Sequence, residues 1–204
     1  MPSSSLIVLA SASPRRRELL AAVGLDFLVV PSQVDETLLD NETPREHVLR
    51  LSRAKALEVA NRTQQEGRWF IGSDTVVVCD QTVLGKPADP VEARSMLQRL
   101  SGRSHAVLSG YAVHDRHSGT TLCGAVSTKV FFKALTASEI ESYIATGEPF
   151  DKAGAYAIQG AGMFMVPRIE GSYTNVVGLP LCEVLADLDA LGALPKSAFP
   201  RLQP

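Results

Sequence analysis

The stretch LIVLASASPRRRELL, from Leu6 to Leu20, decides the fold class of this chain. Its first five residues, Leu6 to Ala10, form a short apolar run bounded by polar residues, which predicts a buried strand. Ser13 and Pro14 then predict a helix start, with the serine as N-cap and the proline at the first helical position. This strand and helix begin the alternation of elements that is typical of α/β proteins.

The rest of the chain continues the alternation. Apolar runs predict strands over residues 27–30 and 69–78, the second broken near Gly72–Asp74, and capping residues predict helices over 43–65, 89–100, 136–146 and from 175 or 176 to 191. Residues 105–114 and 121–132 predict a long hairpin, and a glycine-rich stretch covers 147–162. We therefore expect an α/β fold with a mixed sheet in one domain, 1–204, with a frayed tail over about 193–204.

Composition excludes several classes of protein. The chain has 204 residues, of which 45% are hydrophobic, and a net charge of -2, so no overall basic field favours nucleic acid as a partner. Its three cysteines are scattered without CxxC spacing, which favours a reducing compartment over a disulfide framework or zinc site. No apolar run approaches the roughly 20 residues of a membrane span. We expect a cytoplasmic protein without membrane or nucleic-acid partners.

Three consecutive arginines, Arg15, Arg16 and Arg17, fall in the first turn of the predicted helix. Cations are disfavoured at the positive end of the helix dipole, where backbone N–H groups are also unpaired. A bound anion would remove this conflict, because N–H groups and guanidinium groups would then bind it together, and phosphate is the obvious candidate. The alternative is a solvated basic face. In either case we expect one of the three arginines to face solvent.

Two further residues are unusual for their positions. Lys55 lies on the apolar face of its predicted helix with Val48, Leu51 and Val59, so it must face a phosphate or pair with a carboxylate. Asp74 interrupts an apolar strand, which favours a general base or a metal ligand. A local turn between the Asp74 side chain and the backbone is the alternative.

Weaker candidates lie in two loops. Lys86 occupies the centre of the turn Leu84–Pro87, and Asp35 and Glu36 follow the second predicted strand. Adjacent carboxylates near basic residues suit a hard metal ion that bridges to phosphate, although a solvated pair explains them equally well.

Several familiar sites are missing from the sequence. It contains neither GxxxxGKS/T nor GxGxxG, which excludes a P-loop and a dinucleotide fingerprint, and it lacks the GxSxG elbow of hydrolases. His114 and His117 have a metal-like spacing but lie at the predicted hairpin turn, where a metal site is disfavoured. The remaining set of arginines, lysines and acids suits a nucleoside triphosphate with magnesium, and composition and spacing lead no further.

A series of motifs, in order, closely resembles the Maf family of nucleoside-triphosphate pyrophosphatases. The resemblance covers roughly residues 6 to 192 and is carried by the segments 9–20, 34–36, 55–56, 73–75, 85–87, 100–103, 150–160 and 171–180. It implies an elongated two-lobed fold, similar to that of inosine-triphosphate pyrophosphatases, with the nucleotide in a central cleft. It also implies release of pyrophosphate from the triphosphate with a divalent cation, Mg²⁺ or Mn²⁺, and a homodimer.

The same resemblance implies roles for individual residues. Asp74 matches the proton acceptor. Glu36 and Asp74, as the carboxylates of this set, are the candidate ligands of the divalent cation. Phosphate-facing positions are matched by Arg15, Lys55 and Lys86, and Ser11 and Glu36 line the same pocket. Beside these matches, Arg16 is the candidate for a second arginine contact. Thr75 and Gln159 resemble the branch that prefers dTTP and UTP over 7-methyl-GTP, with Arg15 also bearing on specificity. Two alternatives stay open: the same chemistry on 7-methyl-GTP, and a nucleotide-binding regulator of cell division whose turnover is incidental.

Overall fold

The structure is a computed structural model and describes residues 6–194. Its strands are β1 (Ile7–Leu9), β2 (Phe27–Val29), β3 (Trp69–Cys79), β4 (Thr82–Leu84), β5 (Ser104–Asp115), β6 (Thr121–Phe131) and β7 (Arg168–Glu170). They form one seven-stranded sheet in the order β2-β1-β3-β5-β6-β7, with β4 paired to β3. β1 is parallel to β2 and β3, whereas β4 is antiparallel to β3 and β7 to β6. The predicted α/β class and mixed sheet are confirmed.

The helices are α1 (Pro14–Ala22), α2 (Pro44–Ala60), α3 (Pro90–Leu100), α4 (Ala137–Ala145), α5 (Tyr173–Val177) and α6 (Leu181–Ala190). No helix of the described residues is long and apolar enough to cross a membrane. The chain divides into two compact units, and β3, β5 and β6 contribute residues to both. The predicted frayed tail lies outside the described residues, apart from its first two positions.

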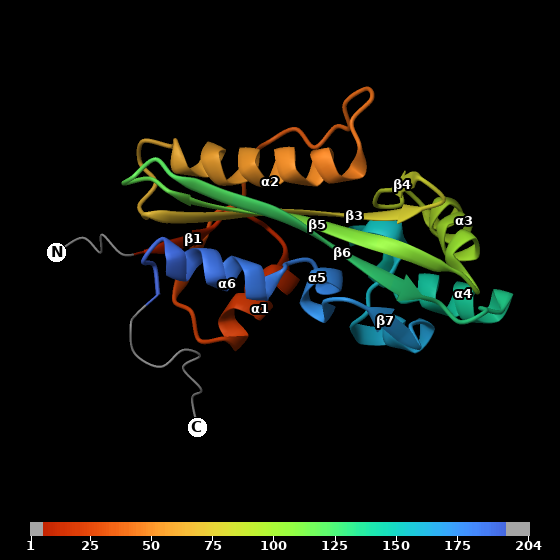
Figure 1. Ribbon diagram of the computed structural model, residues 1–204. Coiled ribbons are helices and arrows are strands. Elements are labelled where there is room, and N and C mark those ends of the chain that lie inside the picture. Colours follow the sequence, from red (N-terminus) through yellow and green to blue (C-terminus); the bar gives the residue numbers. More distant parts are fainter. Residues whose placement is uncertain (1–5, 195–204) are drawn as a thin grey trace. The chain divides into compact units, whose positions relative to one another are not determined.

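The first unit comprises the described parts of residues 1–74, 109–125 and 178–204. Its strands are apolar on both faces, because side chains alternate across a strand and both faces are covered. Ile7 and Leu9 pack with Leu20 of α1 and Val184 of α6, whereas the intervening Val8 packs with residues of α2. Figure 1 shows α2 (orange) on one face of these strands and α1 (red) and α6 (blue) on the other.

Helix α2 begins with a complete capping box, in which Thr43 and Glu46 satisfy each other's backbone N–H groups. The sequence predicted a helix as far as about residue 65, but α2 ends at Ala60 and turns follow it. Its end is shorter than predicted because Asn61 caps the helix, through a backbone N–H bond to Leu57 O. Residues 62–65 are polar and bury no apolar face that would extend it.

Strand β3 is continuous, so the predicted break near Gly72–Asp74 is wrong. Gly72 is needed for another reason: a Cβ there would lie 2.0 Å from Ser52 O and 2.7 Å from Ala56 N of α2. Gly110 of β5 has the same role, since its Cβ would lie 2.1 Å from Val48 O. Two glycines therefore let the backbone of α2 approach the strands closely.

The second unit comprises residues 75–108 and 126–177. Its core joins β3 and β4 residues to α3, α4 and three short 3-10 helices at Glu148–Asp151, Ala153–Ala155 and Gly160–Met165. These helices occupy the predicted glycine-rich stretch. The short strands β4 and β7 were not predicted.

The predicted single helix from 175 or 176 to 191 is instead two helices, α5 and α6, and this prediction is wrong. Gly178 has φ +127, which is a backbone conformation that other residues rarely adopt, and Pro180 cannot donate a helical hydrogen bond. At this break, Gly178 O accepts hydrogen bonds from Arg16 Nε and Ser73 Oγ.

Candidate functional site

Asp74 is the centre of the candidate site in the first unit. Only 7% of the residue is exposed, and it lies in the middle of β3 between apolar residues. Gly72 and Asp74 are two apart in the strand, so both face α2. The adjacent Ser73 side chain points the other way and donates to Gly110 O at 2.9 Å and Gly178 O at 3.2 Å. These bonds fix the backbone that carries Asp74.

Lys55 of α2 is the principal partner of Asp74. Its Nζ lies 2.7 Å from Asp74 Oδ1 and 2.5 Å from Glu36 Oε1, and the residue is 5% exposed. Of the two alternatives that the sequence left open, the structure shows the ion pair with carboxylates. A buried ammonium requires such partners, and two carboxylates more than balance one positive charge. The structure therefore brings together Glu36, Lys55 and Asp74, three of the candidate site residues.

The loop that carries Glu36 is stabilised by hydrogen bonds within the loop and by one from α2. Asp35 Oδ1 accepts bonds from Thr37 N at 2.9 Å and Thr37 Oγ1 at 2.6 Å, and these bonds lower the pKa of Asp35. Arg50 Nη2 donates to Thr37 O at 3.1 Å. Asp35 thus shapes the loop, whereas the neighbouring Glu36 reaches Lys55. The two adjacent carboxylates have different roles.

Three residues around Asp74 were missed by the sequence interpretation: Glu42, His47 and Arg50. Arg50 donates to Glu42 through Nε at 2.5 Å and Nη2 at 2.7 Å, and these bonds lower the pKa of Glu42 to about 2. His47 Nδ1 lies 2.9 Å from Glu42 Oε2, and its Nε2 lies 3.9 Å from Asp74 Oδ2. The spacing of His47, four and eight residues before Leu51 and Lys55, places it on the same helix face and could have revealed it.

The arginine-bearing segment occupies the start of α1, as predicted. Ser13 is the N-cap by position, but its side chain makes no capping bond. Arg16 donates through Nε to Gly178 O at 2.8 Å and through Nη1 to Ser73 O at 2.8 Å and Ser11 Oγ at 3.0 Å. Burial lowers the pKa of Arg16, while Asp74 and Glu36 act in the opposite direction. Part of the charge conflict at this helix end is therefore relieved by protein oxygens.

The other two arginines differ in exposure. Arg17 is exposed, which confirms that one of the three faces solvent, and Arg15 is half-buried. Ser11 is buried, and its Oγ accepts from Ser13 N at 3.2 Å as well as from Arg16. Ser11 and Arg16 are thereby linked to the Ser73 carbonyl, next to Asp74. The anion predicted at this helix end stays a prediction.

Three predicted site residues belong to the second unit. Thr75 directly follows Asp74 in β3 and is half-buried. Lys86 is exposed on a turn that is held by a bond from Gly154 N to Gly85 O at 2.9 Å. Gln159 is half-buried at the start of a 3-10 helix, where Ala161 N donates to Glu148 Oε1 at 3.0 Å. Both loops are thus fixed by bonds within their own unit.

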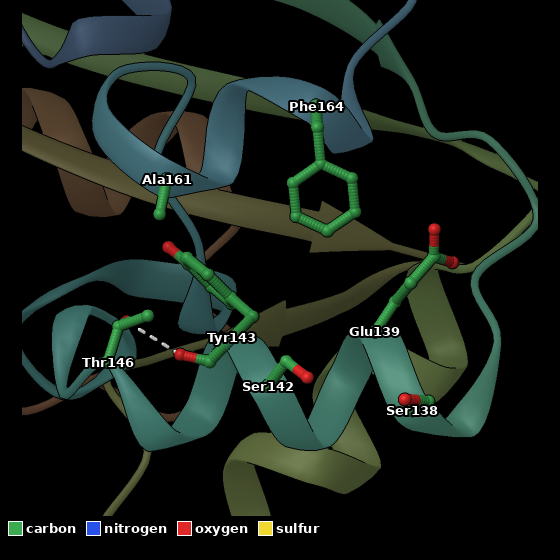
Figure 2. Close-up of a pocket in the computed structure, with 7 residues that line it drawn as sticks. All are labelled: Ser138, Glu139, Ser142, Tyr143, Thr146, Ala161 and Phe164. Carbon is green, nitrogen blue, oxygen red and sulfur yellow. Dashed lines mark hydrogen bonds between the residues drawn. The ribbon is translucent and has the colours of Figure 1, made fainter.

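A pocket of about 360 Å³ lies in the second unit. Figure 2 shows the residues that line it. Tyr143 and Phe164 supply its aromatic walls, and Ala161 lies beside them; Ser138, Glu139, Ser142 and Thr146 complete the lining. The Thr146 hydroxyl donates to Tyr143 O at 2.6 Å and is therefore already engaged. None of the predicted site residues lines this pocket.

The two histidines of the hairpin, whose spacing resembles that of metal ligands, lie in different surroundings. His114 Nδ1 lies 2.9 Å from Thr121 Oγ1, and His117 is exposed. Within residues 6–194, no group of three or more histidine, cysteine, aspartate or glutamate side chains is arranged to hold a metal ion.

Comparison with known proteins places these features in a family. The family model described as "Maf-like protein" matches residues 6–191. A dTTP/UTP pyrophosphatase of Syntrophotalea carbinolica is 64% identical over 188 residues, which cover 92% of this chain and 86% of that protein. Proteins of the same name from Geobacter metallireducens and Myxococcus xanthus are 57% and 50% identical, and the matches cover 95% and 92% of this chain and 100% and 93% of theirs.

Proposed function

This chain belongs to the Maf family, and from that we propose that it is a nucleoside-triphosphate pyrophosphatase that hydrolyses dTTP and UTP to the monophosphate and pyrophosphate. The relatives that carry this name match more than nine-tenths of the chain. The observation that carries the proposal in the structure is the buried Asp74, held by Lys55 and accompanied by Glu36. A buried carboxylate with fixed cationic partners is a common arrangement in catalytic sites.

In the proposed reaction, water attacks the α-phosphorus of the nucleotide. Asp74 takes one proton from the water as the new P–O bond forms. The bond between the α-phosphorus and the bridging oxygen breaks, and its electron pair leaves with the pyrophosphate. The protein has to orient the water and neutralise charge on the leaving group, since these are the main sources of catalysis in phosphoryl transfer.

Cationic side chains would neutralise the developing charge. We assign this role to Lys55, to Lys86 on its fixed turn and to Arg15 at the start of α1, where backbone N–H groups add to the field. Arg16 is the second arginine assigned to the phosphates. Its bonds to Ser11 Oγ and the Ser73 carbonyl also hold this segment against β3.

Glu36 and Asp74 would hold the divalent cation, Mg²⁺ or Mn²⁺. They fit the chemistry of a magnesium site, because Mg²⁺ is usually bound through one or two carboxylates together with substrate phosphates and water, without a dedicated cage of protein ligands. Both carboxylates already meet at Lys55 Nζ, so they lie close to each other. When bound, the cation would supply charge neutralisation at the phosphate oxygens.

Base selection is assigned to Thr75, Gln159 and Arg15, with the pyrimidine nucleotides dTTP and UTP as substrates. We further propose that the enzyme acts in the cytoplasm as a homodimer and that its partner is the nucleotide, without a role for nucleic acid or membrane. These assignments derive from the family resemblance.

The test of the proposed function is to hydrolyse UTP in ¹⁸O-labelled water with Mg²⁺ or Mn²⁺ and to identify the products. We expect UMP and pyrophosphate in equal amounts, with the label in UMP, because the water oxygen bonds to the α-phosphorus. Label in pyrophosphate, or formation of UDP and phosphate, would contradict the proposed site of attack. A pure protein that binds UTP and releases no product would instead support the alternative function, a nucleotide-binding regulator of cell division.

A further inference from the structure

His47 lies between two carboxylates on the face of α2 that also carries Lys55. Its Nδ1 is 2.9 Å from Glu42 Oε2, its Nε2 is 3.9 Å from Asp74 Oδ2, and the residue is only 5% exposed. Both ring nitrogens face charged oxygens, so the chemistry of the ring requires an explanation.

The surroundings of Glu42 determine which nitrogen carries the proton. Glu42 accepts from Arg50 Nε and Nη2 and from Leu39 N at 3.3 Å, and its pKa of about 2 keeps it ionised at neutral pH. An ionised carboxylate only accepts hydrogen bonds, so His47 Nδ1 donates to it. The contact of Arg50 Nη2 with Nδ1 is longer, at 3.3 Å, and Nη2 already donates to Glu42 Oε2 and Thr37 O.

In the tautomer with its proton on Nδ1, the ring presents the lone pair of Nε2 to Asp74 Oδ2. Both atoms are then acceptors, and their separation of 3.9 Å exceeds that of a direct hydrogen bond. One water molecule can span such a distance by donating one O–H to each atom. The other oxygen of Asp74, Oδ1, is already bonded to Lys55 and is not needed for this contact.

We propose that His47 Nε2 is the second acceptor for the attacking water, which Asp74 Oδ2 and His47 Nε2 hold between them, so that His47 is a catalytic residue. A water that donates both of its protons turns its lone pairs away from both acceptors, towards a substrate. In the reaction, one proton passes to Asp74 Oδ2, the water oxygen bonds to the α-phosphorus, and the hydrogen bond to His47 keeps its direction.

This inference rests on the proposed function, because it assigns a role in the same hydrolysis. It adds Glu42 and Arg50 as positioning residues, which set the ring tautomer through Nδ1 without touching the water. The assignment differs from a purely structural role in one respect. It requires an acceptor at the position of Nε2, whereas a structural role requires only the bond to Glu42.

Two substitutions separate these roles. The amide of His47→Asn reaches about as far as Nδ1, so it can still donate to Glu42 and leaves no acceptor towards Asp74. The amide of His47→Gln reaches about as far as Nε2 and offers its oxygen there as an acceptor. We expect the Asn variant to lose about 100-fold in kcat on UTP with little change in KM, since a misplaced reactant costs about this much. The Gln variant should recover at least tenfold of that loss.

Controls connect the loss to the water. His117→Asn, at an exposed position, should leave kcat unchanged. Adding His47→Asn to Asp74→Asn should lower kcat by less than about a further threefold. The effects of two groups that act on one water are not additive. Thermal unfolding checks that every variant is folded. If the Asn variant does not fold, the Gln variant alone tests the proposal. In that case, a kcat of the Gln variant below about one-hundredth of the parent's contradicts the proposal.

A folded Asn variant with the kcat of the parent would overturn the role of His47, and so would equal kcat values for the Asn and Gln variants. Either result would leave the proposed function intact as long as the parent releases pyrophosphate. If the parent itself releases none from UTP, the proposed function fails, and the role of His47 in it fails with it.

Discussion

Lys55 Nζ and Asp74 Oδ1 lie 2.7 Å apart and form a buried ion pair that joins α2 to β3. Each charge is stable in this position because of the other, and Glu36 adds a second carboxylate at 2.5 Å. The close packing that Gly72 allows between α2 and β3 makes this distance possible. The pair is therefore both a structural link and the origin of the proposed chemistry.

Replacement of Lys55 by methionine should destabilise the protein and reduce its activity. It leaves the Asp74 carboxylate buried without its cation, which typically costs about 3–5 kcal/mol. The free energy of unfolding from urea titration measures the effect. Lys129→Met, at an exposed lysine, is the control and should cost less than about 0.5 kcal/mol. Equal stability of the two variants would show that the buried pair contributes nothing.

Asp74→Asn should lower kcat by about 10²–10⁴-fold, because the amide cannot accept a proton from water. The fold should persist, since the amide has nearly the same shape as the carboxyl group. The measurement is pyrophosphate release from UTP, alongside thermal unfolding. Asp80→Asn, at an exposed turn position with φ +48 that asparagine tolerates, should retain the parent's rate. Parent-like activity of Asp74→Asn would remove Asp74 as the base.

Gly72→Ala should separate α2 from β3. The new Cβ would meet Ser52 O at 2.0 Å and Ala56 N at 2.7 Å, and helix backbone cannot yield as a flexible side chain does. We expect a loss of roughly 1–3 kcal/mol of stability or more, together with lower activity as Lys55 moves away from Asp74. Gly85→Ala has open space around its Cβ and should unfold at the parent's temperature. Unchanged activity of Gly72→Ala would contradict this account of α2.

His105 should make the stability depend on pH. Burial lowers its pKa from 6.5 to about 4, and its Nε2 lies 2.7 Å from the Tyr156 hydroxyl. The unfolded chain then binds a proton that the folded protein does not, so stability falls as the pH decreases from about 6.5 to about 4. A pKa shift of this size corresponds to a change on the order of 3 kcal/mol in the free energy of unfolding.

His105→Phe removes this titration, and urea unfolding at several pH values measures the change. The slope of stability against pH between 4 and 6.5 should become shallower, although not zero, because burial also lowers the pKa of His114. His117→Phe, at the exposed histidine, should leave the slope unchanged. An equal slope in the parent and in His105→Phe would contradict the assigned cause.

Much of the fold and several candidate site residues could be predicted, because the local sequence patterns agree with the packing of these segments in the folded protein. The apolar run from Leu6 and the capping residues at Ser13 and Thr43 placed elements correctly. Lys55 and Asp74 were found because a charge on an apolar face requires a partner. For Lys55, an ion pair with a carboxylate was only one of two alternatives, the other being a phosphate, because the sequence does not show which segments contact each other.

Other features depend on contacts that no local pattern contains. A break was predicted near Gly72–Asp74, whereas β3 is continuous there and Gly72 allows the close approach of α2. Arg16 resembled a pure anion ligand, and its protein acceptors include Gly178 O, 162 positions away in the chain. The spacing of His47 places it on the helix face of Lys55, but the sequence does not show that Asp74 lies opposite, and only the fold brings the two side chains together.

The central claim is pyrophosphate release from pyrimidine triphosphates, and a panel of dTTP, UTP, CTP, GTP, 7-methyl-GTP and ITP tests it most directly. Pyrophosphate formed from each nucleotide, with Mg²⁺ or Mn²⁺ present, gives kcat/KM for the whole panel. We predict the highest kcat/KM for dTTP or UTP. A clear preference for 7-methyl-GTP would contradict the assignment of Thr75 and Gln159, and absence of pyrophosphate from every nucleotide would contradict the proposed function itself.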